Sequence, residues 1–126
     1  ALVLDRDAAS AAAARDWLAR FLAGRNVTEA QLADAALIVS ELVTNAWRHG
    51  AGQVSVRVAM TADGAIQLLV SDAAPTLPRV GAGDGAQVGG WGLQIVEHLA
   101  SEWGVDPDPV GKTVWATVPR AAVKAG

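Results

Sequence analysis

The stretch from Gln31 to His49 constrains the fold most, because it has the pattern of one long amphipathic helix. Apolar residues recur there at steps of three and four, which places them along one side of an α-helix. On another side, Glu41, Asn45 and His49 follow one another at four-residue steps, which turn a helix only about 40° past a full turn. We expect the buried side to comprise Leu32, Ala36, Val39, Val43 and Ala46. Any helix with a solvated face has such polar spacing, so the pattern does not by itself indicate a site.

Composition narrows the class of protein. The 126 residues suffice for one domain, 1–126, with its own hydrophobic core. Alanine inflates the hydrophobic content of 52%, no run approaches the ~20 apolar residues of a membrane span, and Ala1 to Ser10 lacks a signal segment. The absence of cysteine excludes disulfides and thiolate metal sites and favours a cytoplasmic location. A net charge of −3 argues against non-specific binding to nucleic acid.

Ahead of the long helix, the sequence predicts a short strand within Ala1 to Asp5 and a helix from about Asp7 to Ala23. Gly24 is a natural end for that helix. Thr28 and Gln31 have the spacing of a capping box at the start of the long helix. The core face of the first helix would comprise Ala14, Trp17, Leu18 and Phe21.

Strands follow the long helix. Val54 to Met60 alternates apolar and polar residues, as a strand with one covered and one solvated face does. Asp63-Gly64 predicts a tight turn into a second strand, Ile66 to Val70, so this pair is antiparallel. Residues 73–89 are rich in glycine and proline and have no periodicity. A loop of that length in a small domain is usually a functional lid or disordered.

The C-terminal third predicts a third helix, from Gly90 to about Glu102, with Leu93, Val96 and Leu99 or Ala100 buried. Trp103 to Val105 begins another strand, Asp106 to Gly111 forms a turn, and Lys112 to Val118 is the closing strand.

Four short motifs stand out along the chain. Each is weak alone: an aspartate after a strand is usually a turn residue, and G-x-G-L is more often an ordinary loop-to-helix junction. Lys112 alone also fits an exposed charge on an edge strand. The motifs are E-L-V-T-N-A-W-R-H-G (Glu41 to Gly50), Asp72 in V-S-D-A-A-P, G-G-W-G-L (Gly89 to Leu93) and G-K-T-V-W (Gly111 to Trp115).

In this order and spacing the motifs resemble the ATP-binding fold shared by gyrase, the large heat-shock chaperones, mismatch-repair ATPases and sensor histidine kinases. The closer resemblance is to the branch with bacterial anti-sigma-factor serine kinases, and it runs from about Asp7 to Pro119. It implies an α/β fold of two layers, in which a mixed, mostly antiparallel sheet has about three helices on one face. It also implies that ATP and Mg²⁺ are the cofactors and that residues 73–89 form the ATP lid.

The resemblance assigns roles to the polar residues of the helix and of the strand that follows it. Asn45 supplies an oxygen ligand to Mg²⁺, which usually takes only one or two ligands from protein. Glu41 acts as the catalytic base or orients the attacking group. Asp72 accepts a hydrogen bond from the adenine amino group, which guanine does not offer there. The resemblance also counts His49 among the cofactor-binding residues, and this histidine is equally suited to stabilise the end of the helix.

The remaining site residues come from the loop and the last two motifs. Gly90 and Gly92 allow the backbone of a helix start to approach the phosphates, and Arg79 or Lys112 adds a charged phosphate contact. The resemblance places Thr113 beside the adenine, and Pro75 and Leu93 complete the cofactor-binding set. Three residues depart from the family pattern: Ala74 replaces a glycine or serine, Trp91 an arginine or histidine, and Trp47 an aliphatic residue.

Three functions compete at this point. The first is an ATP-dependent serine/threonine kinase that phosphorylates an antagonist protein and holds a sigma factor inactive. Autophosphorylation on histidine is disfavoured, because His49 and His98 are the only histidines and neither lies on a separate dimerisation hairpin. The second is a non-catalytic nucleotide-sensing module whose lid a partner recognises. The third is a small α/β domain without a ligand. A homodimer stays open.

Overall fold

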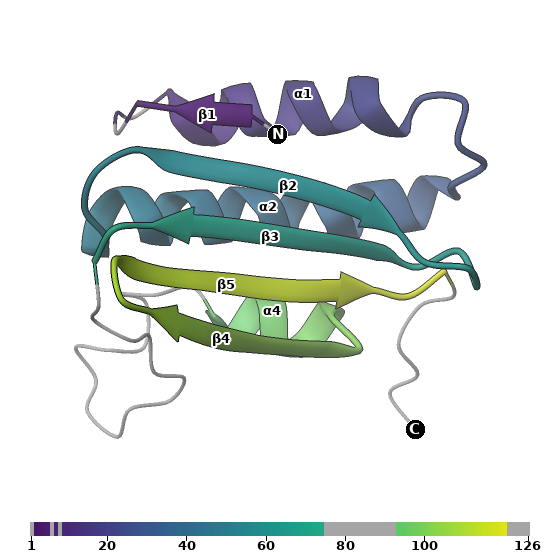
Figure 1. The fold of residues 1–126 in the computed structure, drawn as a ribbon. Helices are drawn as coiled ribbons and strands as arrows, with labels where there is room; N and C mark the ends of the chain where they lie inside the picture. The colour runs from purple at the N-terminus through teal and green to yellow at the C-terminus, as the bar shows by residue number, and fades with distance from the viewer. Residues whose placement is uncertain (1, 6, 8, 75–92, 121–126) are drawn as a thin grey trace.

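The computed structural model describes residues 2–5, 7, 9–74 and 93–120, which form a sheet with helices against it. Figure 1 shows the three helices on the same side of the sheet, so the described residues build two layers, as the resemblance implied. In chain order the elements are β1 (Leu2–Leu4), α1 (Ser10–Leu22), α2 (Glu29–His49), β2 (Val54–Met60), β3 (Ile66–Asp72), α4 (Leu93–Leu99), β4 (Glu102–Asp108) and β5 (Gly111–Val118).

The strands lie in the order β1-β2-β3-β5-β4. Every neighbouring pair among these described strands is antiparallel, so the parallel pair that a mixed sheet allows does not occur there. The predicted hairpin is confirmed: β2 and β3 pair, and Gly64 in their turn has a positive φ of 87°. The expected α/β sandwich is therefore confirmed, with β5 inside the sheet and β4 at its edge.

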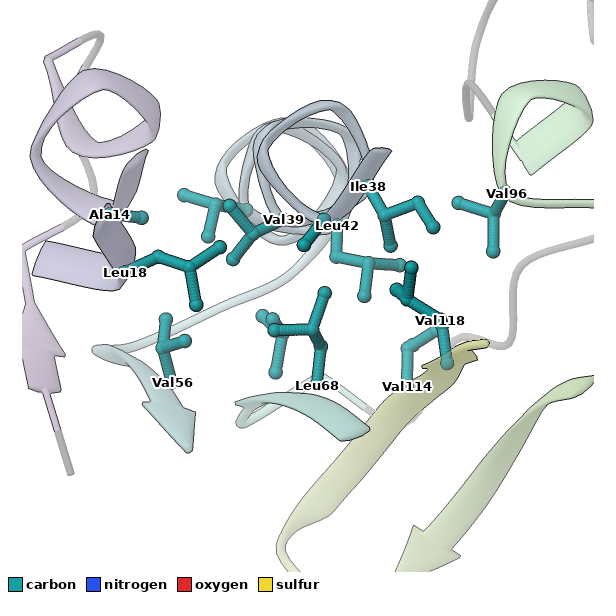
Figure 2. Close-up of a cluster of buried hydrophobic side chains, with 14 of the residues drawn as sticks. Ala14, Leu18, Ile38, Val39, Leu42, Val56, Leu68, Val96, Val114 and Val118 are labelled. Carbon is teal, nitrogen blue, oxygen red and sulfur yellow. The ribbon is translucent and has the colours of Figure 1, made fainter. Parts of the chain in front are cut away.

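Helix α2 packs over the centre of the sheet, with α1 on one side of it and α4 on the other (Figure 2). Because α1, α4 and the sheet all contact α2, a wider part of its surface is buried than the predicted stripe. Val39, Val43 and Ala46 are buried as expected, whereas Leu32 and Ala36 are only half-buried. Side chains outside the expected stripe complete the buried face, namely Gln31, Ala35, Ile38, Leu42 and Asn45.

The start of α2 makes only half of the expected capping box. The hydroxyl of Thr28 accepts a hydrogen bond from the backbone N–H of Gln31 at 2.9 Å. The side chain of Gln31 does not return the bond to Thr28. Its amide instead donates to the carbonyl of Gly64 at 2.8 Å and to that of Val118 at 3.4 Å. Gln31 thus joins the helix to the β2–β3 turn and to the end of β5.

The ends of several other helices and strands differ from the sequence-based expectation, most of them by one to three residues. α1 buries Ala14, Leu18 and Leu22, while Trp17 and Phe21 are half-buried beside this core. α4 ends at Leu99, and the residue predicted as the end of that helix, Glu102, begins β4. β4 continues through Pro107 to Asp108 because an edge strand tolerates a proline. Among the described residues, no helix is long and apolar enough to cross a membrane.

Two adjacent residues of α2 test the packing of this helix. Ile38 is fully buried and Leu37 is 50% exposed. We expect Ile38→Ala to lower the free energy of unfolding by about 2–5 kcal/mol, because it leaves a cavity between helix and sheet. Leu37→Ala is the matched control and should change it by less than about 0.5 kcal/mol. Urea denaturation followed by circular dichroism measures both, and equal losses would contradict this packing.

Candidate functional site

A small cavity lies where the C-terminal half of α2 meets β3, β5 and the first residue of α4. The end of β3 and the start of β5 lie at the same end of the sheet as the end of α2 (Figure 1). The cavity measures about 10 Å³, which is room for about one water molecule. Its wall is apolar apart from three side chains, Asn45, Asp72 and Lys112. The apolar lining comprises Leu42, Ala46, Val70, Leu93 and Val114.

Asp72 and Lys112 form a buried ion pair in this wall. They are direct partners in the register of β3 with β5, and the Lys112 ammonium lies 2.9 Å from Asp72 Oδ1. Both side chains are only 2% exposed. The same Oδ1 accepts the backbone N–H of Ala74 at 2.7 Å, and Lys112 also donates to the Ala74 carbonyl at 3.2 Å. Lys112 is therefore not an exposed charge, and β5 is not an edge strand.

Asn45 faces the same cavity from α2. It is 6% exposed, and its Nδ2 has no hydrogen-bond partner among the described residues. A buried N–H without a partner costs roughly 1–3 kcal/mol, so the cavity is suited to a ligand or a water that accepts this bond. As an amide, Asn45 also offers an oxygen that suits Mg²⁺ without adding charge.

Glu41 lies one helical turn before Asn45 and is half-buried. Partial burial raises the pKa of the Glu41 carboxyl above its ordinary value, and the attraction of Arg48 opposes that shift. A carboxylate with a raised pKa accepts a proton more readily than an ordinary glutamate does. No group of three or more His, Cys, Asp or Glu in the described ranges is placed to hold a metal ion.

Thr113 does not lie in the cavity. Successive residues of a strand point to opposite faces, so Lys112 and Val114 face the helices and Thr113 faces away. The Thr113 hydroxyl bonds the Ser71 hydroxyl at 2.7 Å on that other face. Lys112, rather than Thr113, therefore lines this cavity, and the roles that the resemblance gives to both residues at the nucleotide stay predictions.

The other expected site residues divide into two groups. His49 is half-buried in the last turn of α2, and Leu93 lines the cavity from the start of α4. Gly50 lies so close to Asp72 that a Cβ on it would be 2.6 Å from the carboxyl carbon. Ala74, one of the three departures from the family pattern, is buried, and Trp47, another of them, is half-buried. The remaining expected positions lie outside the described residues, namely the lid beyond Ala74 with Pro75 and Arg79, and Gly90, Trp91 and Gly92.

Solved structures share this fold. The crystal structure of the RsbU and RsbW domains of Rv1364c from Mycobacterium tuberculosis matches with a TM-score of 0.69 and 26% identity, over 98% of this chain and 33% of that one. The histidine kinase domain of the Erythrobacter litoralis EL346 blue-light activated histidine kinase matches in fold, with a TM-score of 0.51 and 24% identity over 71% of this chain and 44% of that one. This chain thus spans about a third of the first protein. No curated protein sequence matches it.

The match to a family model defines the class of this domain. Residues 4–118 match the family described as "Histidine kinase-like ATPase domain", and the chain belongs to this family. The family description implies that the domain binds ATP.

Gly111 tests how closely the strands approach at this site. A Cβ on Gly111 would overlap the backbone carbonyl oxygen of Asp72 and lie 2.7 Å from the Cα of Ala73. Because backbone atoms cannot move aside cheaply, we expect Gly111→Ala to lower the free energy of unfolding by roughly 1–3 kcal/mol. Val110→Ala is the control, since that side chain is 77% exposed. Chemical denaturation decides, and an unchanged midpoint for Gly111→Ala would show that the strands do not approach so closely.

Glu41 gives a pH-dependent prediction. A carboxyl whose pKa is raised by folding binds its proton more tightly in the folded state, so its contribution favours folding at low pH and is lost as pH rises through the raised value. Glu41→Gln should therefore be more stable than wild type at pH 7, by less than about 1 kcal/mol because Glu41 is partly solvated. The difference should shrink toward pH 4. Urea titrations across this range measure it, and a variant less stable at pH 7 would contradict the raised pKa.

Proposed function

We propose that this chain is an ATP-dependent protein kinase domain of the anti-sigma-factor type, which transfers the γ-phosphate to a serine or threonine of an antagonist protein. The observation that supports it most is the pair on α2, in which half-buried Glu41 with its raised pKa precedes Asn45 by one turn. The likeness to a structure with an RsbW domain over 98% of the chain supports the same class.

The residues would divide the work as follows. Asp72 accepts from the adenine amino group, and Asn45 contributes a ligand to Mg²⁺. Bound Mg²⁺ would neutralise charge on the phosphates. Glu41 accepts the proton of the attacking hydroxyl while the hydroxyl oxygen bonds the γ-phosphorus and the bond to the β-phosphate oxygen breaks, which leaves ADP. The antagonist, a sigma factor, a homodimer and the cytoplasmic location remain predictions from the resemblance and composition.

A second candidate is a nucleotide-sensing module that binds ATP without turnover. Ala74 favours it, because both backbone polar groups of this buried residue are tied, the N–H to Asp72 and the carbonyl to Lys112. A side chain and two fixed hydrogen bonds give the chain less freedom beside the nucleotide than the glycine usual in the family.

Asn45 and Glu41 separate the two candidates. Asn45→Ala should weaken Mg²⁺-dependent ATP binding about tenfold or more, because it removes a polar contact to a charged group. Glu41→Ala should leave ATP binding nearly intact, while transfer falls by about 10²–10⁴, the usual contribution of a general base. Calorimetric titration with MgATP measures binding, and movement of radiolabelled phosphate to a candidate antagonist measures transfer.

Thr44→Ala is the matched control on α2, since Thr44 lines a different surface hollow beside Trp47. It should change neither binding nor transfer. ATP binding without transfer or hydrolysis in wild type and in Glu41→Ala alike would replace the kinase by the sensing module. Absence of ATP binding by folded wild type would remove both candidates.

A further inference from the structure

Lys112 is the largest fully buried side chain of the described residues, and its ammonium group lies in the core beside Asp72. Apolar residues of similar volume often replace a buried ion pair without loss of stability. The neighbouring residues on the same face of β5 are apolar: Val114, Ala116 and Val118. A lysine at this position therefore suggests a role in the cavity that it lines.

Hydrogen bonds within the described part of the chain leave capacity on both members of this pair. An ammonium has three N–H donors, and Lys112 uses two of them, for Asp72 and for the Ala74 carbonyl. An ionised carboxylate has about four acceptor positions on two oxygens, and both bonds given above fall on Oδ1. The carboxylate and the ammonium thus lie side by side in one wall of the cavity, joined at Oδ1 by their 2.9 Å bond.

That arrangement matches one edge of adenine, on which the 6-amino donor adjoins the N1 acceptor. Guanine has a carbonyl and an N–H at these two positions, so each group would meet a partner of its own kind. A site built for hydrogen bonds rejects such a base strongly, because its buried polar groups lose their partners.

We propose that Lys112 is a specificity-determining residue that donates a hydrogen bond to N1 of adenine while Asp72 accepts one from the 6-amino group. This proposal rests on the ATP-binding function proposed above. The cavity of about 10 Å³ is too small for a base, so side chains must move when one binds. Lys112 has the long flexible side chain in this wall, whereas Val70 and Val114 are β-branched and stiff.

The test compares three ligands by calorimetric titration of the full chain with Mg²⁺. They are ATP, 1-deazaadenosine triphosphate, in which C–H replaces N1, and purine riboside triphosphate, which lacks the 6-amino group. Wild type should bind ATP about ten- to hundredfold more tightly than the 1-deaza analogue, the usual effect of losing a bond to a charged group. In Lys112→Met that ratio should fall to about two or less, while the ratio of ATP to purine riboside triphosphate is kept.

Lys112→Gln keeps a neutral donor and should restore part of the ratio, which a purely structural role would not produce. If Lys112→Met does not fold, the ratios of wild type and Lys112→Gln still decide. Equal wild-type affinity for ATP and its 1-deaza analogue would overturn the inference and leave ATP binding standing. If Lys112→Met weakened the binding of all three ligands equally, Lys112 would have a structural role only. If it tightened their binding equally, the Lys112 side chain would obstruct the site. Either result would overturn the proposal. No binding of any ligand by folded wild type would remove the proposed function first.

Discussion

The packing of α2 on the middle of the sheet is the interaction on which the site depends. Ile38 and Leu42 pack against side chains of β3 and β5, among them Leu68 and Val118 (Figure 2). Burying a large aliphatic side chain contributes about 1.5–3 kcal/mol, so a few such contacts offset the cost of polar groups nearby. Asn45 lies within one turn of Leu42, and the apolar face therefore fixes where its amide meets the cavity. The position of this polar side chain is thus set by the packing of the apolar residues beside it.

The antiparallel register of β3 and β5 is the second constraint, because it makes Asp72 and Lys112 direct partners. A buried ion pair is weak evidence for stability, since desolvation offsets much of the attraction between the charges. Its effect here is geometric: the two bonds to Ala74 hold the chain just after β3 against β5. Gly111 and Gly50 permit this approach, since a side chain on either would collide with Asp72. The close approach of the backbone at Gly50 and Gly111, the ion pair and the cavity therefore depend on one another at this end of the sheet.

Periodicity predicted most of the fold, because helix and strand patterns follow directly from which residues are buried. It was less successful where a polar residue is buried. Gln31 was expected to cap its own helix, yet its amide bonds Gly64 and Val118, which are distant in sequence. The sequence did contain evidence that Lys112 is buried. It shares the two-residue spacing of Val114, Ala116 and Val118, which places it on their buried face and Thr113 on the other. The partner of that lysine was not predictable, because strand register arises only from the tertiary fold. The residues outside the described ranges that the resemblance places at the phosphates stay predictions, namely Arg79, Gly90 and Gly92.

Asn45 and Glu41 of the predicted site each bear a cost in the free protein, as does Gln31 outside it, whose Oε1 is buried without a partner among the described residues. Asn45 has a buried N–H without a partner among the described residues, and half-burial of Glu41 raises the pKa of its carboxyl. Both features reduce the stability of the free protein, and both fit a site that a polar ligand completes. A ligand that bonds Asn45 removes a cost that the free protein bears, so part of that cost returns as binding affinity. In the proposed kinase Glu41 would differ, since a proton taken up in the reaction, rather than ligand binding, would relieve the cost of its partly buried charge. On the proposed mechanism the two residues share one helix face but would respond to different events, Asn45 to binding and Glu41 to proton transfer.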